Sequence, residues 1–175
     1  MRDIFPNNKN YVVFDIETTG FSVAKDRITE IGAVRIVNGK IADTFSELVN
    51  PRTDISRRIT EITGITNDMV KDKATIADVL PRFLDFCADA TVVAHNASFD
   101  VSFIKQNAKN LGKEFSNEVL DTLTFARRLL PRLENHKLNT VAKKLGVKML
   151  RAHRAKDDAL ATAEIFLKLA EMLAK

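Results

Sequence analysis

The segment that decides the fold is YVVFDIETTG, residues 11–20. Its apolar, β-branched start predicts a short strand over Tyr11–Ile16, buried at the centre of a sheet. The Thr-Thr-Gly that follows marks the exit into a turn. Side chains alternate between the two faces of a strand, so Asp15 and Glu17 share one face with Val13. Two carboxylates therefore lie side by side at the end of an otherwise apolar strand.

Two acids in such a place need a physical reason. Side chains at positions i and i+2 of a strand are about 7 Å apart, and poorly solvated like charges repel each other. A hard divalent cation between the carboxylates would stabilise both, because such cations prefer oxygen ligands. The alternative is that Asp15 and Glu17 lie beyond the strand end, where water solvates them or Asp15 caps a turn.

The rest of the chain surrounds this strand with further strands and helices. Strands are expected at Ile28–Val37 and Lys40–Val49, since the Asn-Gly pair between them is a strong hairpin signal. Short helices and turns in Pro51–Val70 come next, and later a buried strand at Thr91–Ala94 and a fifth strand or helix entry at Val119–Leu123. Helices are expected at Ile76–Ala88, Ser98–Leu111, Leu123–Leu130, Leu138–Leu145 and Ala155–Ala174. This order indicates an α/β fold with a mixed sheet flanked by helices.

The composition fits one globular domain over residues 1–175, with its core in about 10–173. Of the 175 residues, 45% are apolar and 29% are charged, which are ordinary values. No apolar run is long enough to span a bilayer, and the N-terminus MRDIFPNNKN has no signal-peptide core. The single cysteine, Cys87, excludes an internal disulfide and a cysteine-based zinc site. A cytoplasmic protein without a membrane partner is expected.

Positive charge is concentrated toward the C-terminus. Residues 1–120 carry 15 basic and 17 acidic side chains, whereas residues 121–175 carry 12 basic and 6 acidic ones. The segment 127–156 alone has ten Lys or Arg and a single acid, Glu134. Such a stretch on a nearly neutral body suggests a polyanion partner, most simply nucleic-acid phosphate. A solvated basic surface would give the same pattern.

The last expected helix places two adjacent aspartates on different faces. Asp157 aligns with charged residues and is expected at the surface, whereas Asp158 lies beside the apolar stripe and is expected to be half-buried. A half-buried carboxylate needs a partner, which is either the helix dipole or a cation shared with other acids. The stripe itself comprises Ala155, Ala159, Ala163, Phe166, Ala170 and Leu173.

Asp100 is a further candidate because it follows the strand expected at Thr91–Ala94. It is expected in the first turn of a helix that Asn96 or Ser98 caps. The helix dipole alone would favour an acid there. Ligands of open α/β sheets, however, collect at the carboxyl ends of strands, and Asp15 and Glu17 end a strand of the same sheet.

The three histidines divide into one candidate and two others. His153 lies on the loop five residues before Asp158, where an ordinary imidazole is suited to act as a general base near neutral pH. The alternative is a surface histidine in a basic stretch. His95 is expected to be structural, and His136 is expected at the surface.

Three motifs connect these candidates: DIETTG at 15–20, HNASFD at 95–100 and HRAKDD at 153–158. In this order, and with His-x4-Asp in the last, they resemble the DEDDh 3′→5′ exonucleases of ribonuclease H-like fold. The resemblance is strongest to the proofreading exonuclease domain of PolC-type bacterial DNA polymerase III and covers about Asn10–Leu173. It implies a five-stranded mixed sheet, three strands antiparallel and then two parallel, flanked by helices.

The resemblance also implies a role for each candidate. Asp15 and Glu17 would be metal ligands from the first motif, and Asp158 the ligand from the third. Asp100 would act on metal through water, and His153 would be the general base. None of these five residues is substituted here.

Four positions are implied as substrate contacts. The backbone of Thr18 and Thr19 would hold the terminal nucleotide. Ile62 and Phe99 would wedge its base, although core packing is the alternative for both.

The implied reaction is hydrolysis of DNA from its 3′ end to nucleoside 5′-monophosphates. Two divalent ions, Mg²⁺ or Mn²⁺, would hold the attacking water and the leaving 3′ oxygen, and four carboxylates balance their charge. The expected role is proofreading during replication, with the DNA 3′ end and a replicative DNA polymerase as partners, in the same chain or as a separate subunit. The alternatives are an RNA-trimming exonuclease with the same five residues and a non-catalytic nucleic-acid-binding module.

Overall fold

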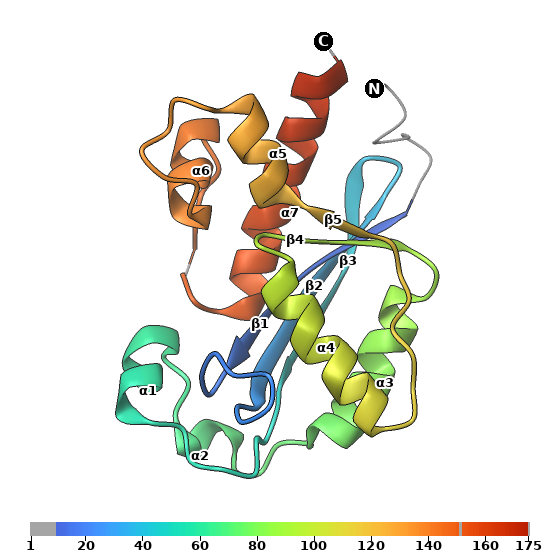
Figure 1. The fold of residues 1–175 in the computed structure, drawn as a ribbon, viewed down its shortest axis with the longest axis vertical. Coiled ribbons are helices and arrows are strands. Elements are labelled where there is room, and N and C mark those ends of the chain that lie inside the picture. Colours follow the sequence, from blue (N-terminus) through green and yellow to red (C-terminus); the bar gives the residue numbers. More distant parts are fainter. Residues whose placement is uncertain (1–9, 151, 175) are drawn as a thin grey trace.

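The centre of the molecule is a mixed sheet of five strands, seen in a computed structural model that describes residues 10–150 and 152–174. The strands are β1 (Tyr11–Thr18), β2 (Ile28–Val37), β3 (Lys40–Leu48), β4 (Thr91–Ala94) and β5 (Val119–Asp121). Their order across the sheet is β3-β2-β1-β4-β5 (Figure 1). The first three are antiparallel, and β4 and β5 run parallel to β1. This confirms the expected sheet, in which β5 is a short strand that leads directly into a helix.

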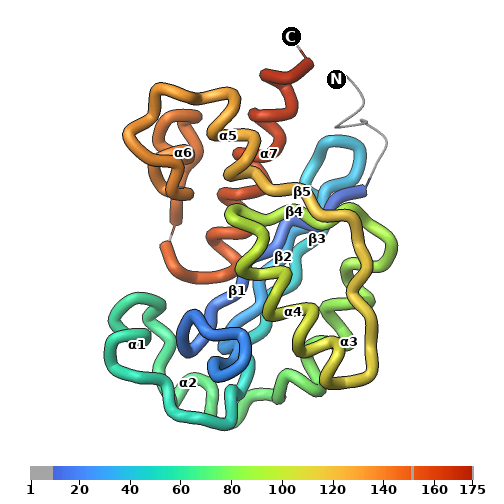
Figure 2. Tube along the Cα trace, viewed as in Figure 1, coloured from blue at the N-terminus to red at the C-terminus, as the bar shows by residue number. Residues whose placement is uncertain are grey.

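Helices cover both faces of this sheet. The side chains of Val12, Phe14 and Ile16 point toward α3 (Ile76–Cys87) and α4 (Ser98–Asn110) and form the larger core cluster with them. The opposite face of β1, with Tyr11 and Val13, packs on α7 (Ala155–Ala174). The alternation expected for β1 is therefore confirmed, and the two layers can be followed in Figures 1 and 2.

Four shorter helices complete the fold: α1 (Arg57–Thr63), α2 (Asn67–Val70), α5 (Thr122–Leu129) and α6 (Leu138–Leu145). Gly64 ends α1 in a left-handed conformation, as its position in Thr-Gly had indicated. The helices α5 and α6 pack on the outer side of α7. Figure 1 shows α1 and α2 on one side of the end of β1 and α5 and α6 on the other. None of the described helices has both the length and the apolar character of a membrane span.

Two expectations about helix ends were wrong. Neither Asn96 nor Ser98 caps α4, because Ala97 occupies the capping position and makes no side-chain bond. Asp157 is not at the surface but only 6% exposed. A single buried stripe was assumed for α7, whereas the helix is buried on a second side as well, against α5 and α6. Asp157 lies one turn before Ala161 of that second side.

Candidate active site

The first two acids lie where β1 extends past its parallel neighbour. Asp15 is paired with Gly32 and Glu17 with Glu30 on β2, so both carboxylates are on the sheet face that α7 covers. The strand continues to Thr18, and its register with β2 shifts between Glu17 and Thr18. The acids are thus inside the strand and half-buried, rather than beyond the strand end as the alternative had it.

Asp100 takes the place of a missing strand partner. The pairing of β4 with β1 ends at Val13, so the amide of Ile16 has no strand neighbour on that side. The N–H of Ile16 instead donates to Oδ1 of Asp100 at 3.1 Å, across 84 residues of sequence. Asp100 is 4% exposed. This hydrogen bond holds the start of α4 against the end of β1 and brings the buried carboxylate of Asp100 beside the half-buried Asp15.

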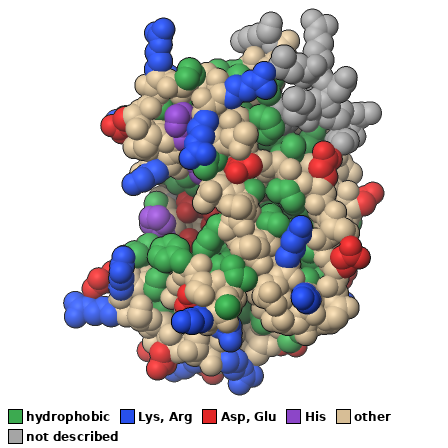
Figure 3. Space-filling view, in the orientation of Figure 1, with side chains coloured by type: hydrophobic (Ala, Val, Ile, Leu, Met, Phe, Trp, Pro, Cys, Tyr) green, Lys and Arg blue, Asp and Glu red, His purple; other side chains and the backbone are tan. Residues whose placement is uncertain are grey.

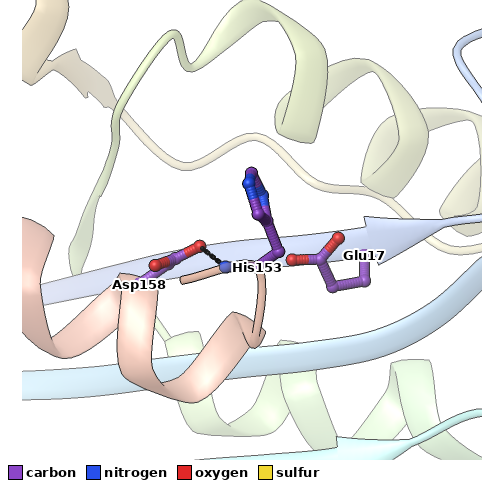
Figure 4. A group of neighbouring side chains, drawn as sticks. All are labelled: Glu17, His153 and Asp158. Atoms are coloured by element: carbon purple, nitrogen blue, oxygen red, sulfur yellow. Dashed lines mark hydrogen bonds between the residues drawn. The ribbon is translucent and has the colours of Figure 1, made fainter. Parts of the chain in front are cut away.

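Asp158 and His153 are positioned together at the start of α7. The backbone N–H of His153 donates to Oδ2 of Asp158 at 2.9 Å, which closes the loop before the helix. His153 has a φ of 61°, in the left-handed region, and its side chain is exposed. One ligand atom each from Glu17, His153 and Asp158 lies within 4.8 Å of the others (Figure 4). The structure thus brings residues of the first and third motifs into one cluster.

Burial raises the pKa of all four acids, and repulsion from neighbouring carboxylates adds to this at each of them. Burial raises the pKa of Asp15 well above its ordinary value, and the charges of Asp100, Glu17 and Asp158 add to this. Burial, followed by the charge of Asp158, raises the pKa of Glu17 to about 8. Burial likewise raises the pKa of Asp100 to about 7 and that of Asp158 to about 6. The charge of Arg154 lowers the pKa of Glu17, and that of His153 lowers the pKa of Asp158, but both offset only part of the rise.

The carboxylates of these residues are suited to bind divalent cations. Oδ1 of Asp158 is buried and has no hydrogen-bond partner among the described residues. A buried acceptor without a partner is costly, and carboxylate oxygens are the ligands that hard divalent ions prefer. A cation would satisfy this oxygen and offset the repulsion between the acids.

The four expected substrate contacts differ in exposure and in what they bind. Thr18 is buried, and the hydroxyl of Thr19 accepts from the N–H of Arg27 at 3.0 Å, so both side chains shape the turn after β1. Ile62 is 41% exposed, which rules out core packing for it. Phe99 is half-buried.

Phe21 was not among the expected contacts, although its side chain is 78% exposed. Its ring lies 6.2 Å, centre to centre, from that of Phe99, which in turn packs 5.1 Å from Phe103. An exposed phenylalanine beside a conspicuous acidic motif is the signal that would have found it. Figure 3 shows a recess in which acidic side chains are visible next to a histidine, with hydrophobic side chains along one rim.

A basic hollow of about 480 Å³ lies at the other histidines. His95 is structural as expected, since Nδ1 contacts Thr122 Oγ1 at 2.9 Å and Nε2 contacts the carbonyl of His136 at 2.8 Å. Burial lowers the pKa of His95. His136 is half-buried rather than at the surface, because its ring contacts the carbonyl of Leu130. The other lining residues are Asn96, Leu123, Arg127, Asn135 and Lys137.

A second missed feature is the contact between β2 and the loop before α7. The buried carboxylate of Glu30 is bound by the guanidinium of Arg154, at 2.8 and 3.1 Å. A charged residue inside the apolar run ITEIGAV is the signal that would have drawn attention to Glu30. Its partner, 124 residues away, could not be read from the sequence.

Comparisons with known proteins agree with this geometry. The family model described as exonuclease matches residues 12–166. The PolC-type DNA polymerase III of Caldanaerobacter subterraneus subsp. tengcongensis is 57% identical over 163 residues, which are 93% of this chain and 12% of that protein. The corresponding protein of Clostridium perfringens is 54% identical over 155 residues, 89% of this chain and 11% of that protein. The chain thus spans little more than a tenth of the length of these relatives.

Solved structures share the fold. Exonuclease X, in a complex with 5′ overhanging duplex DNA, matches with a TM-score of 0.77 and 33% identity over 92% of this chain and 91% of that one. Exonuclease I matches with a TM-score of 0.81 and 20% identity over 94% of this chain and 41% of that one. These matches confirm the expected ribonuclease H-like sheet. The ordered motifs, their convergence at the end of β1 and these matches show that the chain belongs to the exonuclease family, in the DEDDh group that includes the exonuclease region of PolC-type DNA polymerase III.

Proposed function

We propose that this chain is a metal-dependent 3′→5′ exodeoxyribonuclease that acts on single-stranded or frayed DNA 3′ ends. The observation that carries the proposal is the convergence of four carboxylates and one exposed imidazole at the end of β1. The PolC-type relatives support proofreading during replication as the setting. The complex of exonuclease X with duplex DNA supports DNA as the substrate.

The acids would hold two divalent ions, Mg²⁺ or Mn²⁺. Asp15, Glu17 and Asp158 would bind them directly, and Asp100 would bind through water, as the resemblance to the DEDDh exonucleases implies. When bound, such ions supply positive charge for the scissile phosphate and favour ionisation of the attacking water.

The other side chains around the cluster would orient and deprotonate the reactants. The imidazole of His153 lies beside Glu17 and Asp158 and is open to solvent, so it would accept the proton of the attacking water. The exposed ring of Phe21 and the half-buried ring of Phe99, with Ile62 on α1, would contact the base of the last nucleotide. The backbone of Thr18 and Thr19 would hold its sugar.

The direct test is a nuclease assay with DNA strands labelled at either end. With Mg²⁺ or Mn²⁺, a 5′-labelled strand should shorten stepwise from its 3′ end, and the products should be nucleoside 5′-monophosphates. Single-stranded and mismatched 3′ ends should be degraded about tenfold faster than paired ends, because opening one base-pair step costs roughly 1–2 kcal/mol. Equal rates on blunt duplex and single strand would argue against proofreading.

Two further arms of the assay separate the alternatives. An RNA strand of the same sequence tests RNA trimming, and faster degradation of RNA than of DNA would favour that reaction. A protein that binds single-stranded DNA but releases no nucleotide with either metal would be a binding module. Whether the chain works within a polymerase chain or beside one is tested by adding a PolC-type polymerase and measuring the removal of a mismatched primer end.

A further inference from the structure

The loop that carries His153 is bound to β2 through Glu30, which is not one of the four catalytic acids. The carboxylate of Glu30 accepts three hydrogen bonds: 2.8 Å from Nη2 of Arg154, 3.1 Å from Nε of Arg154 and 3.0 Å from the backbone N–H of Ala155. The side chain of Glu30 is 2% exposed and that of Arg154 is 24% exposed. A bidentate pair of this kind fixes both distance and orientation.

Gly32, two residues along the same strand face, makes this approach possible. A Cβ at Gly32 would lie 2.2 Å from backbone atoms of Ala155 and Lys156, where no side chain can fit. The first turn of α7 therefore lies directly on the backbone of β2. Glu30 and Gly32 are paired with Glu17 and Asp15, so the loop is held against the strand next to the one that carries the acids.

His153 is consequently held from both sides. Its own N–H is bound by Asp158, and the two residues that follow it are bound by Glu30. Without the second contact, a loop with a left-handed residue at His153 would have to keep its shape through the Asp158 bond alone. A general base has to lie within hydrogen-bond reach of the proton it takes, so the position of this loop matters for the rate.

We propose that Glu30 and Arg154 are a positioning pair that fixes the His153 loop over the catalytic acids, and that Glu30 is withheld from metal binding because Arg154 occupies its carboxylate. This rests on the proposed function of His153 as the base. Glu30 is thus a fifth acid at the site, itself buried, with a role distinct from that of the other four.

A double-mutant cycle with His153 tests the pair. Glu30→Gln should lower kcat by about tenfold to a hundredfold, the range that a misplaced catalytic group costs, with KM and the Mg²⁺ concentration for half-maximal rate unchanged. Because Glu30 acts through His153, the same change in a His153→Ala background should lower kcat by less than about twofold. A full, multiplicative loss in that background, or a folded Glu30→Gln variant with wild-type kcat, would overturn the proposal.

The chain offers a matched control in Glu47 and Arg82. This pair is also bidentate, at 3.0 and 2.6 Å, but joins β3 to α3. Glu47→Gln should leave kcat unchanged. If Glu30→Gln fails to fold, the double-mutant cycle with His153→Ala is repeated with Arg154→Lys and Arg154→Gln. Arg154→Lys should lower kcat less than Arg154→Gln, because a lysine keeps the charge and one hydrogen bond to Glu30.

An independent readout does not need activity. Heteronuclear ¹⁵N relaxation on the wild type should show the amides of His153 and Arg154 as rigid as those of β1, and Glu30→Gln should make them mobile on the ps–ns timescale. Glu47→Gln should leave them rigid. If the loop stays rigid in Glu30→Gln, the positioning role is wrong; if the loop loosens but the wild type releases no nucleotides, the proposed function is wrong and the structural pair stands.

Discussion

At the scale of single residues, the four acids differ in what else they bind. Asp100 accepts the N–H of Ile16, and Asp158 accepts the N–H of His153. Asp15 has no hydrogen bond to its carboxylate in the described ranges, although it is surrounded by other negative charges. Little in the described part of the protein therefore stabilises its ionised form, and the proposed divalent ions would do so.

Asp15→Asn tests this assignment most directly. Turnover with Mg²⁺ should fall by more than about tenfold, because the loss of one negative charge weakens a site that needs several to bind two ions. The melting temperature in a chelator should rise, because repulsion with Asp100 and Glu17 is removed. Activity and circular dichroism measurements check both. The control is Glu164→Gln, an exposed site on α7, which should change neither the turnover nor the melting temperature. An Asp15→Asn variant that keeps more than about a tenth of the wild-type rate would contradict the ligand role of Asp15.

His153→Ala separates proton transfer from metal binding. Turnover should fall by roughly 10²–10⁴-fold, the usual share of general-base catalysis, while KM and metal affinity stay close to those of the wild type. Steady-state kinetics at several substrate and Mn²⁺ concentrations measure all three quantities. A mutant that keeps most of its rate would show that His153 is only a surface residue.

At the scale of elements, the site is a junction of β1, α4 and α7. Burial of its acids couples folding to pH, and the sign follows from the raised pKa values. A carboxyl whose pKa is raised by folding holds its proton more tightly in the folded state. This contribution to stability is fully present below the ordinary pKa of about 4 and is lost as the pH rises through the folded values, about 6 for Asp158, about 7 for Asp100 and about 8 for Glu17.

The metal-free protein should therefore become less stable between pH 5 and pH 8. The expected fall in melting temperature is several degrees, since a domain of this size loses about 2–4 °C per kcal/mol of stability. Thermal unfolding in a chelator at several pH values measures this. Addition of Mn²⁺ should largely remove the fall, because the ions offset the repulsion. A melting temperature that is flat or rises over this range without metal would show that the acids are not a repulsive cluster.

Local sequence patterns predicted the strands and helices. Contacts between residues far apart in the sequence could not be predicted in this way. The hairpin at Asn38-Gly39 and the faces of β1 follow from turn chemistry and from the two-residue period, both of which are local. The burial of Asp157 depends on how α5 and α6 return to cover α7, and the Glu30–Arg154 contact depends on how β2 meets a loop near the other end of the chain. The spacing of residues within a motif therefore predicts neither the burial of Asp157 nor the Glu30–Arg154 contact.

At the scale of the whole molecule, two basic residues of the segment 127–156 line a hollow near the loop that leads to Asp100. The hollow with Arg127 and Lys137 includes Asn96, which is on the loop that leads from β4 to Asp100. Figure 3 shows basic side chains along this side of the recess. A strand whose last phosphate reaches the acids would therefore meet positive charge with its preceding phosphates.

Replacement of both Arg127 and Lys137 by Gln should raise KM for long strands and leave kcat unchanged. Two lost phosphate contacts should reduce the slope of log affinity against log salt by about 1.4, at about 0.7 per contact with a single strand. KM for a dinucleotide should hardly change, because it is too short to reach the hollow. The matched control is Lys109→Gln with Lys113→Gln, at the opposite end of α4 from Asp100. An equal rise in KM for both lengths would show that the hollow does not bind the strand.

The hydrogen bond between Asp100 and Ile16 decides which inactive variant is suited to crystallising the protein with a nucleic acid bound. A trapped complex needs a variant that is inert yet keeps its native shape. Asp100 is a poor choice for this purpose, because its carboxylate also completes the sheet where β4 has left β1. A change there would loosen the backbone from which Asp15 and Glu17 project. Asp15→Asn removes charge without removing a backbone contact, and it is the variant with which crystals of a stalled complex are best sought.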